Sequence, residues 1–478
     1  MTSAAIAVIC TATILMGVFG LSLTRSTGDF YVASRRISPL TNASAIAGEY
    51  LSAASFLGVV GLIYLWGPQG LWLPIGYTAG FLVLLLFVAA PLRRSGAYTL
   101  PDFMILRFRS AVVRRMTTVV VVLTGWLYVV PQLRGAVIVT EFSTGLPGWV
   151  GAGLVVVVVL AVVLSGGMRT VTVAQAVQYW VKLAALLIPA VFIVLRAGGE
   201  DAGQALSEPL WRVTVQGDPL IAASLVLALS VGAVGLPHVL VRFYTNPDGH
   251  AARRTAAALV GLVGIFYVIA VLLGLTAVGA LGPSNTEADT ALIQLPAAVL
   301  SDATGDVLVA VLVGGAFAAF LSTTSGLVVS VSGVISQELF GGSVRGFRIG
   351  ALAAVGVPAG LTAAATDVSL AGAVVLVFTF AASTVAPVML LGIWWSRITA
   401  AGAVSGMLTG AASTGLAVVV SAVSVQAPVL LTYPGLWSIP LSFAVIIAVS
   451  LTTEPPASTS AVLTKLHLPE EHRGQSRP

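Results

Sequence analysis

The sequence predicts an all-α polytopic membrane protein with about 13 transmembrane helices. Of its 478 residues, 58% are hydrophobic and only 9% are charged, whereas ordinary soluble domains contain about 25% charged residues. The chain also has 50 glycines, and small residues let membrane helices approach one another closely. Apolar runs of about 20 residues, the length that crosses a bilayer as a helix, recur between short polar loops.

The apolar runs define a single transmembrane domain, residues 1–451. We expect the first run to be retained, because it lacks the basic start and the cleavage site of a signal peptide. The tail, residues 452–478, is polar and proline-rich, and we expect it to be disordered. The expected spans lie near residues 3–24, 41–66, 71–91, 116–141, 149–165, 176–196, 218–238, 255–281, 305–333, 347–365, 369–392, 401–424 and 428–451.

Basic residues gather in the loops that follow odd-numbered spans. Arg93 and Arg94 follow the third span and Arg253 and Arg254 follow the seventh, whereas acidic residues predominate after even-numbered spans. Positively charged loops remain in the cytoplasm, so we expect an outer N-terminus and a cytoplasmic C-terminus in the plasma (inner) membrane. This distribution accounts for the net charge of +5 without a nucleic-acid partner. Cys10, the only cysteine, excludes an intrachain disulfide and a cysteine-based metal cluster.

The second span contains an unusual polar stretch from Gly48 to Gly58, with one carboxylate and several hydroxyl groups. A charged side chain within a bilayer costs at least about 2.5 kcal/mol, so it normally faces a partner or a water-filled cavity. Non-helical backbone at that depth has the same restriction. The stretch therefore predicts either a broken helix that lines a site near the midplane, or a kinked helix whose serines bond to their own carbonyls.

A second interruption lies in the seventh span, where Gly232, Gly235 and Pro237 break the apolar run before His238. The two interrupted spans are five apart. Interruptions at corresponding positions of two halves are typical of transporters built from inverted repeats, with the site between the broken helices. We therefore expect broken helices in spans two and seven of a five-plus-five core, with repeats near residues 41–196 and 218–392.

The ninth span carries adjacent hydroxyl groups at Ser322 and Thr323, one turn beyond Ala319. Sodium is a hard cation that needs several oxygens, which freed carbonyls and neighbouring hydroxyls can supply. The alternative is that these hydroxyls join helices, at about 0.6 kcal/mol per contact.

Four segments resemble the sodium:solute symporter family, and most closely its acetate or monocarboxylate branch. The resemblance extends over residues 28–400 and is carried by Gly48–Gly58, Gly166-Gly167-Met168 with Gln175, Gly235–Thr245 and Ala319–Ser325. It implies a LeuT-type inverted-repeat core. It also implies a Na⁺ site made by main-chain oxygens of Gly48, Leu51 and Ala319 with the hydroxyls of Ser322 and Thr323. A proton remains open as the coupling ion, and no organic cofactor is expected.

Glu49 and Arg134 each have two interpretations. Glu49 either attracts Na⁺ or accepts a proton, or it serves as the structural partner of a basic or hydroxyl group, for which Lys182 is a candidate. Arg134, which departs from the monocarboxylate branch, either anchors a substrate carboxylate with its rigid fork or extends to the interface or to Glu141.

We expect a cation-coupled importer of a small monocarboxylate such as acetate, propionate or pyruvate. Positive helix N-termini at the two breaks would face the carboxylate, with Ser52, Ser55 and Gly232 as contacts. Another solute, such as proline, a sugar or urea, remains an alternative, as does a nutrient-sensing membrane protein. A small accessory membrane protein remains open. An enzyme is disfavoured, because no acid/base pair, metal motif or nucleophile elbow is present.

Overall fold

The computed structural model describes residues 1–21, 37–197, 218–282, 287–300, 302–364, 369–424, 427–457 and 459–470. All regular secondary structure in these ranges is helical, which confirms the predicted fold class. Predictions about residues 22–36, 198–217 and 471–478, chiefly the positions of loop and tail charges, lie outside the described residues.

The first half of the chain supplies the helices that surround the first break. Its elements are α1 (Thr2–Leu21), α3 (Pro39–Tyr50), η2 (Ala54–Gly58), α4 (Val59–Trp66), η3 (Gly67–Leu71), α5 (Trp72–Val83), η4 (Leu84–Val88), α6 (Ala89–Ser95), α7 (Leu100–Phe108), α8 (Ala111–Thr144) and α9 (Gly148–Ala197). Helix α9 is helical over 50 residues. It contains two apolar windows, Gly148–Ser165 and Thr170–Arg196, which correspond to the fifth and sixth expected spans.

The second half supplies the other break and the peripheral helices. Its elements are α11 (Pro219–Gly232), η5 (Ala233–Gly235), α12 (Pro237–Phe243), α13 (Gly249–Leu281), η6 (Ala288–Thr290), α14 (Ala291–Val299), α15 (Ala303–Leu339), α16 (Val344–Ala364), α17 (Leu370–Ser383), α18 (Val385–Trp394), α19 (Ala400–Val423), α20 (Val429–Thr432), α21 (Gly435–Thr452) and α22 (Thr459–His467). Side-chain caps start many of these helices; Asp248, for example, accepts the N–H of Ala251 at the start of α13.

The described residues contain 11 helices long and apolar enough to cross a membrane, or up to 12 if the bent pair α11 and α12 is one span. The expected number of 13 is therefore not confirmed. The difference arises where the second and third expected spans meet. The turn η3 joins them without a polar loop, so Ala54–Ser95 counts as one stretch of 42 residues.

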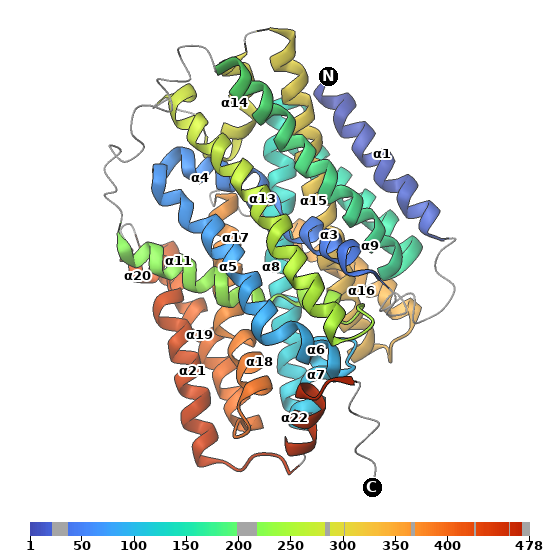
Figure 1. Ribbon diagram of the computed structural model, residues 1–478, viewed down its shortest axis with the longest axis vertical. Coiled ribbons are helices and arrows are strands. Elements are labelled where there is room, and N and C mark those ends of the chain that lie inside the picture. Colours follow the sequence, from blue (N-terminus) through green and yellow to red (C-terminus); the bar gives the residue numbers. More distant parts are fainter. Residues whose placement is uncertain are drawn as a thin grey trace.

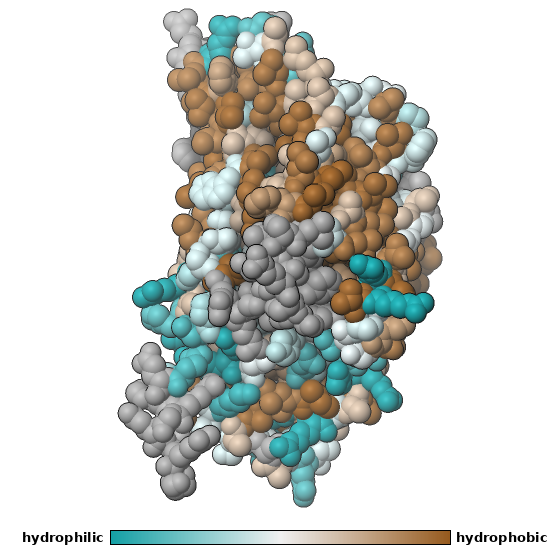
Figure 2. All heavy atoms as spheres, turned by 90° about the vertical axis from the view of Figure 1, so that its right-hand side faces the viewer, coloured by the Kyte–Doolittle hydropathy of each residue, from teal (hydrophilic) through white to brown (hydrophobic). Residues whose placement is uncertain are grey.

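Helix α15 and the span formed by α17 and α18 lie in the interior of the molecule. In their apolar windows 83% and 78% of residues are buried, against 22% in α1. Helix α15 packs against α8, α9 and α16, whereas α19 and α21 pack against each other at the periphery. Figure 1 shows the N-terminus and the helix α22 at opposite ends of the molecule. Figure 2 shows that hydrophobic residues cover much of the visible face, while hydrophilic ones gather toward its lower end.

Part of the tail differs from the expected disorder, because Thr459–His467 form α22, which contacts α6, α7 and α18. Lys465 donates from Nζ to the carbonyl of Ser95 at 2.8 Å, and Arg94 donates to the carbonyl of His467 at 3.1 Å. The composition of the tail did not predict these contacts, because they join polar side chains to carbonyl groups at the ends of helices far away in the sequence.

A salt bridge between Arg94 and Glu470 (3.4 Å) helps to hold this helix. Partial burial opposes ionisation, but hydrogen bonds from backbone N–H groups, that of Gly249 among them, and the charge of Arg94 lower the pKa of Glu470. We predict that Glu470→Gln makes trypsin cleavage after Lys465 about fivefold faster, because a partly exposed ion pair stabilises docking by about 1 kcal/mol. Mass spectrometry of the released peptide measures the rate. An unchanged rate would show that the pair does not hold α22.

Candidate cation and solute site

The first break interrupts the helical secondary structure between Tyr50 and Ala54. At Leu51 the backbone leaves the helical region (φ −72°, ψ 82°), and the freed N–H of Ala53 donates to the side-chain oxygen of Gln132 at 2.9 Å. The hydroxyl of Ser52 makes no hydrogen bond, and that of Ser55 pairs with the hydroxyl of Tyr267 at 2.9 Å. The hydroxyls of these two serines therefore do not bond to the carbonyls of their own helix, as the alternative of a kinked helix required; that span two is a broken membrane helix remains a prediction.

The second break lies between α11 and α12, whose axes differ in direction by 51°. Leu236 is extended there, and Pro237 begins α12, where its missing N–H removes no hydrogen bond. Gly232 and Gly235 allow the break to approach α17: a Cβ at either would lie 2.5 Å from the carbonyl oxygen of Phe378 or of Ala381. Gly232 therefore serves close packing, and its expected contact with substrate remains untested.

All five residues predicted to bind the cation come together, where α3 ends against α15. The carbonyl oxygen of Leu51 and the hydroxyl of Ser322 accept hydrogen bonds from Lys182 Nζ at 2.8 and 2.9 Å, and the carbonyl of Gly48 accepts a third. The hydroxyl of Ser322 donates to the carbonyl of Ala319 at 3.1 Å, and that of Thr323 donates to the carbonyl of Glu49 at 2.6 Å. These oxygens have the chemistry that Na⁺ requires, but the ammonium of Lys182 already lies among them. With the side chains in these positions, the site does not fit a sodium ion.

The sequence suggested Lys182 only as a partner of Glu49. Its place near the candidate cation site could have been predicted, because Lys182 follows Gln175 by seven residues, or two helical turns, and the two therefore share one face of α9. The structure places both side chains against α15, where Gln175 donates to the carbonyl of Ser322 at 2.8 Å.

Glu49 instead pairs with Arg242 of α12. Arg242 Nε lies 2.8 Å from Glu49 Oε2, and both side chains are 1% exposed. The guanidinium also contacts Thr172, Gln175 and Met168 on α9. One buried network therefore links both breaks with α9 and α15.

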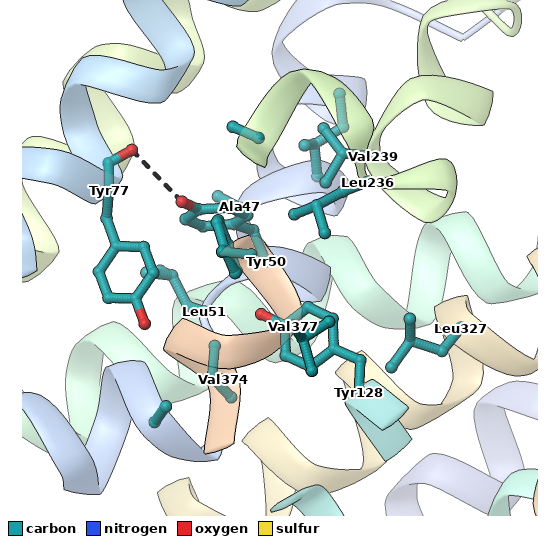
Figure 3. Packing of buried hydrophobic residues seen from close by; sticks show 14 of the residues in the cluster. Ala47, Tyr50, Leu51, Tyr77, Tyr128, Leu236, Val239, Leu327, Val374 and Val377 are labelled. Atoms are coloured by element: carbon teal, nitrogen blue, oxygen red, sulfur yellow. Dashed lines mark hydrogen bonds between the residues drawn. The ribbon is translucent and has the colours of Figure 1, made fainter. Parts of the chain in front are cut away.

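Aromatic rings form a wall beside the first break. Figure 3 shows Tyr50 and Tyr77 close together, joined by a hydrogen bond from the Tyr50 hydroxyl to the Tyr77 carbonyl (3.3 Å), with Tyr128 on another side of the cluster. Tyr77 stacks on Tyr267 at 5.7 Å, and Tyr128 packs edge-on against Phe378 at 5.9 Å. These rings pack closely together beside the break.

His238 packs against this wall, with its ring 5.3 Å from that of Tyr128. Both of its ring nitrogens are buried without a hydrogen bond. His238, where the interruption of the seventh expected span ends, therefore lies fully buried beside the residues of the site.

Arg134 lies in a different environment. It is half-buried and lines a largely apolar groove with Leu370, Thr379 and other residues of α8, α17 and α19. Among the described residues, those of the two breaks do not line this groove. Its charge acts on Asp289. Glu141, its other suggested partner, accepts the N–H of Gly148 at 3.1 Å.

Interrupted helices that meet at converging carbonyl and hydroxyl groups are typical of secondary transporters. The model of the sodium:solute symporter family matches residues 30–410. An uncharacterized symporter of Bacillus subtilis, YwcA, is 31% identical over 466 residues, 90% of each chain. The monocarboxylic acid transporter of Corynebacterium glutamicum is 31% identical over 493 residues, covering 91% of this chain and 88% of the relative.

Two solved structures show the same fold. A Na⁺-coupled sialic acid symporter in a substrate-bound, outward-open state matches with a TM-score of 0.77 at 14% identity, covering 95% of this chain and 98% of its own. MhsT in complex with L-phenylalanine matches with a TM-score of 0.51 at 15% identity, covering 92% and 97%. This chain has the LeuT fold.

The protein therefore belongs to the sodium:solute symporter family. It is a multi-pass membrane protein that transports a solute together with a cation, and it is not an enzyme.

Proposed function

We propose that the protein imports a small monocarboxylate, such as acetate, propionate or pyruvate, by cation-coupled symport across the plasma membrane. The observation that carries this proposal is the 31% identity, over nearly the whole chain, to a relative named as a monocarboxylic acid transporter. Family membership supports sodium as the coupling ion.

The charges beside the first break support an anionic substrate. Two basic side chains, Lys182 and Arg242, and one acidic side chain, Glu49, lie buried beside the first break. Basic groups in a medium of low dielectric constant favour a nearby anion, such as a substrate carboxylate bound beside α3 and α15.

Few polar groups beside the break are available to a substrate. Ser52 Oγ, Tyr77 Oη and the two nitrogens of His238 are buried without hydrogen bonds. A carboxylate has two oxygens and needs only a few donors, whereas a sugar requires many fixed partners. Ser52 is our first candidate for contact with the carboxylate. Ser55, whose hydroxyl pairs with that of Tyr267, is the second.

The proposed orientation has the N-terminus outside and the C-terminus in the cytoplasm. Arg93, Arg94 and Arg107 lie at the end of the molecule where α22 docks, and Figure 1 shows that end opposite the N-terminus. A concentration of arginine near span ends marks the cytoplasmic side.

Uptake of radiolabelled pyruvate into proteoliposomes tests the proposed function. We predict saturable uptake in the wild type that unlabelled acetate and propionate inhibit, and a rise in KM of about tenfold in Ser52→Ala, the loss that one hydrogen bond to a charged group produces. Ser413→Ala is the matched control, because this buried serine of α19 bonds only to the carbonyl of Gly410 in its own helix. Uptake that neither acid inhibits, or inhibition by proline or a sugar instead, would overturn the monocarboxylate assignment.

A further inference from the structure

A small cavity lies between α12 and α15, beside the buried pair of Glu49 and Arg242. Met168, which lines this cavity, accepts a hydrogen bond from Arg242 at 2.9 Å. The volume of the cavity is about 20 Å³, which is room for about one water molecule. A solute that leaves the site by this route must therefore widen the cavity. The residues that line it include Tyr98, Thr99, Met168, Pro237, Val241 and Ser330.

The loop between α6 and α7 forms one wall of this cavity. Helix α6 ends at Ser95, and Gly96 follows in the left-handed conformation (φ 77°), which a glycine adopts without strain. The chain then reaches Tyr98 and Thr99, which line the cavity. Because Tyr98 is 47% exposed, this wall separates the cavity from the surface of the molecule. Movement of the loop would open the cavity.

Helix α22 holds this loop from both sides. Lys465 donates from Nζ to the carbonyl of Ser95, the last residue of α6, at 2.8 Å. On the other side of the loop, Arg107 of α7 donates to the hydroxyl of Thr459, the first residue of α22, at 3.2 Å. Figure 1 shows α22 beside α6 and α7. One short helix therefore fixes the loop at its start and at the helix that follows it.

The residue chain that continues from α22 also reaches the segment that follows α12. Glu470 accepts the N–H of Gly249, the first residue of α13, at 3.0 Å and pairs with Arg94 of α6 at 3.4 Å. Only residues 244–248 separate α12 from α13. Residues 459–470 thus bridge two walls of the cavity, the α6–α7 loop and α12. Contacts that bridge two walls resist their separation.

The docked conformation of α22 depends on such contacts. Its nine residues are fewer than the 12–15 or so that an isolated helix needs to be stable in water. His467 Nε2 lies 2.9 Å from the carbonyl oxygen of Ile393, and its ring packs against that of Trp394 with the centroids 4.7 Å apart. Leu466 is buried. Loss of a few of these contacts would therefore release the helix as a unit.

We propose that residues 459–470 form a latch that keeps this end of the transporter closed, and that the latch must release before the cavity widens to let the solute leave. This inference rests on the proposed symport and concerns its regulation. The balance between the docked and the released latch sets the fraction of molecules in which the cavity can open. Docking slows transport, and release of the latch speeds it.

Labelling of a thiol in the cavity measures its opening without any substrate. Cys10 is the only cysteine of the chain, so Ser330→Cys in a Cys10→Ala background places a single thiol in the cavity. We expect Lys465→Met to make the reaction of this thiol with N-ethylmaleimide about tenfold faster, the effect of losing one hydrogen bond from a charged donor. Lys465→Arg, which keeps a charged donor, should restore slow labelling. An unchanged rate in Lys465→Met would overturn the inference.

Cys10 in the otherwise unchanged chain is the control for a general loosening of the protein. It is buried in α1, and the groove that it lines shares no lining residue with the cavity. Lys465→Met should therefore leave the labelling rate of Cys10 unchanged. Equal acceleration at Cys10 and at Ser330→Cys would show that the substitution loosens the whole protein, and would overturn the role of α22 as a local latch.

Pyruvate uptake into proteoliposomes separates this inference from the proposed function. We expect Lys465→Met to raise the maximal rate of uptake by about twofold or more, because opening steps limit the rate of many such cycles. A lower maximal rate would overturn the inhibitory role of the latch. If the wild type took up no monocarboxylate, the proposed function would be overturned, whereas faster labelling of Ser330→Cys alone would still support the latch.

Discussion

Replacement of Arg242 by methionine should abolish transport and destabilise the protein by about 3–5 kcal/mol, the range measured when one partner of a buried ion pair is removed. The guanidinium is the only charged partner in hydrogen-bond contact with Glu49 among the described residues, and both side chains are 1% exposed. Methionine leaves the carboxylate buried and uncompensated. It also removes the bonds to Thr172 and Gln175 that join α12 to α9.

A double-mutant cycle in detergent micelles measures this coupling. Glu49→Gln removes the negative charge, so the double variant with Arg242→Met should recover about 1–3 kcal/mol of the loss in unfolding free energy. Arg114→Met is the matched control, because Arg114 pairs with Glu338 at 2.6 Å but is 31% exposed, and a partly solvated pair contributes about 1 kcal/mol or less. Equal losses for Arg242→Met and Arg114→Met would contradict the view that Glu49 depends on Arg242.

The residues of the candidate cation site were named from the family resemblance, and local features of the sequence predicted only where the first interruption lies. Glycine and hydroxyl residues within an apolar run reveal where a helix is interrupted, whatever packs against it. The carbonyls of Gly48 and Leu51 and the hydroxyl of Ser322 meet at one point, as expected. The functional assignment of these residues remains a prediction.

The partners of the charged residues could not be predicted in this way. Lys182 lies 131 residues beyond Leu51 along the chain, and Arg242 lies 193 residues beyond Glu49. Whether a lysine reaches a carboxylate or a carbonyl depends on the rotation and depth of its helix, which hydropathy does not specify. For the same reason depth alone did not show that Arg134 lies in a groove lined by α8, α17 and α19.

For the tail, the sequence predicted disorder where the structure contains a helix. Its composition is that of a disordered segment, but nine residues form α22. Docking depends on carbonyls exposed at the ends of other helices, such as that of Ser95. A composition-based argument counts the apolar surface that a segment can bury and does not count acceptors supplied by the rest of the protein.

Gly326→Ala should also inactivate the protein, although it adds only one methyl group. A Cβ at Gly326 would lie 1.9 Å from Glu49 Oε1 and 2.1 Å from its carboxyl carbon. A flexible carboxylate could move aside in solvent, but this one is buried and held by Arg242. We expect a loss of about 3 kcal/mol or more in unfolding free energy, from overpacking together with displacement of the ion pair, and loss of pyruvate uptake.

Gly333→Ala, seven residues further along α15, is the matched control for this prediction. A Cβ there meets nothing within 4 Å, because Gly333 lines the small cavity beside Ser330. Alanine is favoured over glycine by about 1 kcal/mol within a helix, so Gly333→Ala should leave the free energy of unfolding unchanged or raise it. The two variants differ only in what faces the new methyl group. If Gly326→Ala were as stable as Gly333→Ala, Glu49 would have room to move, and the close contact between its carboxylate and α15 would not constrain the site.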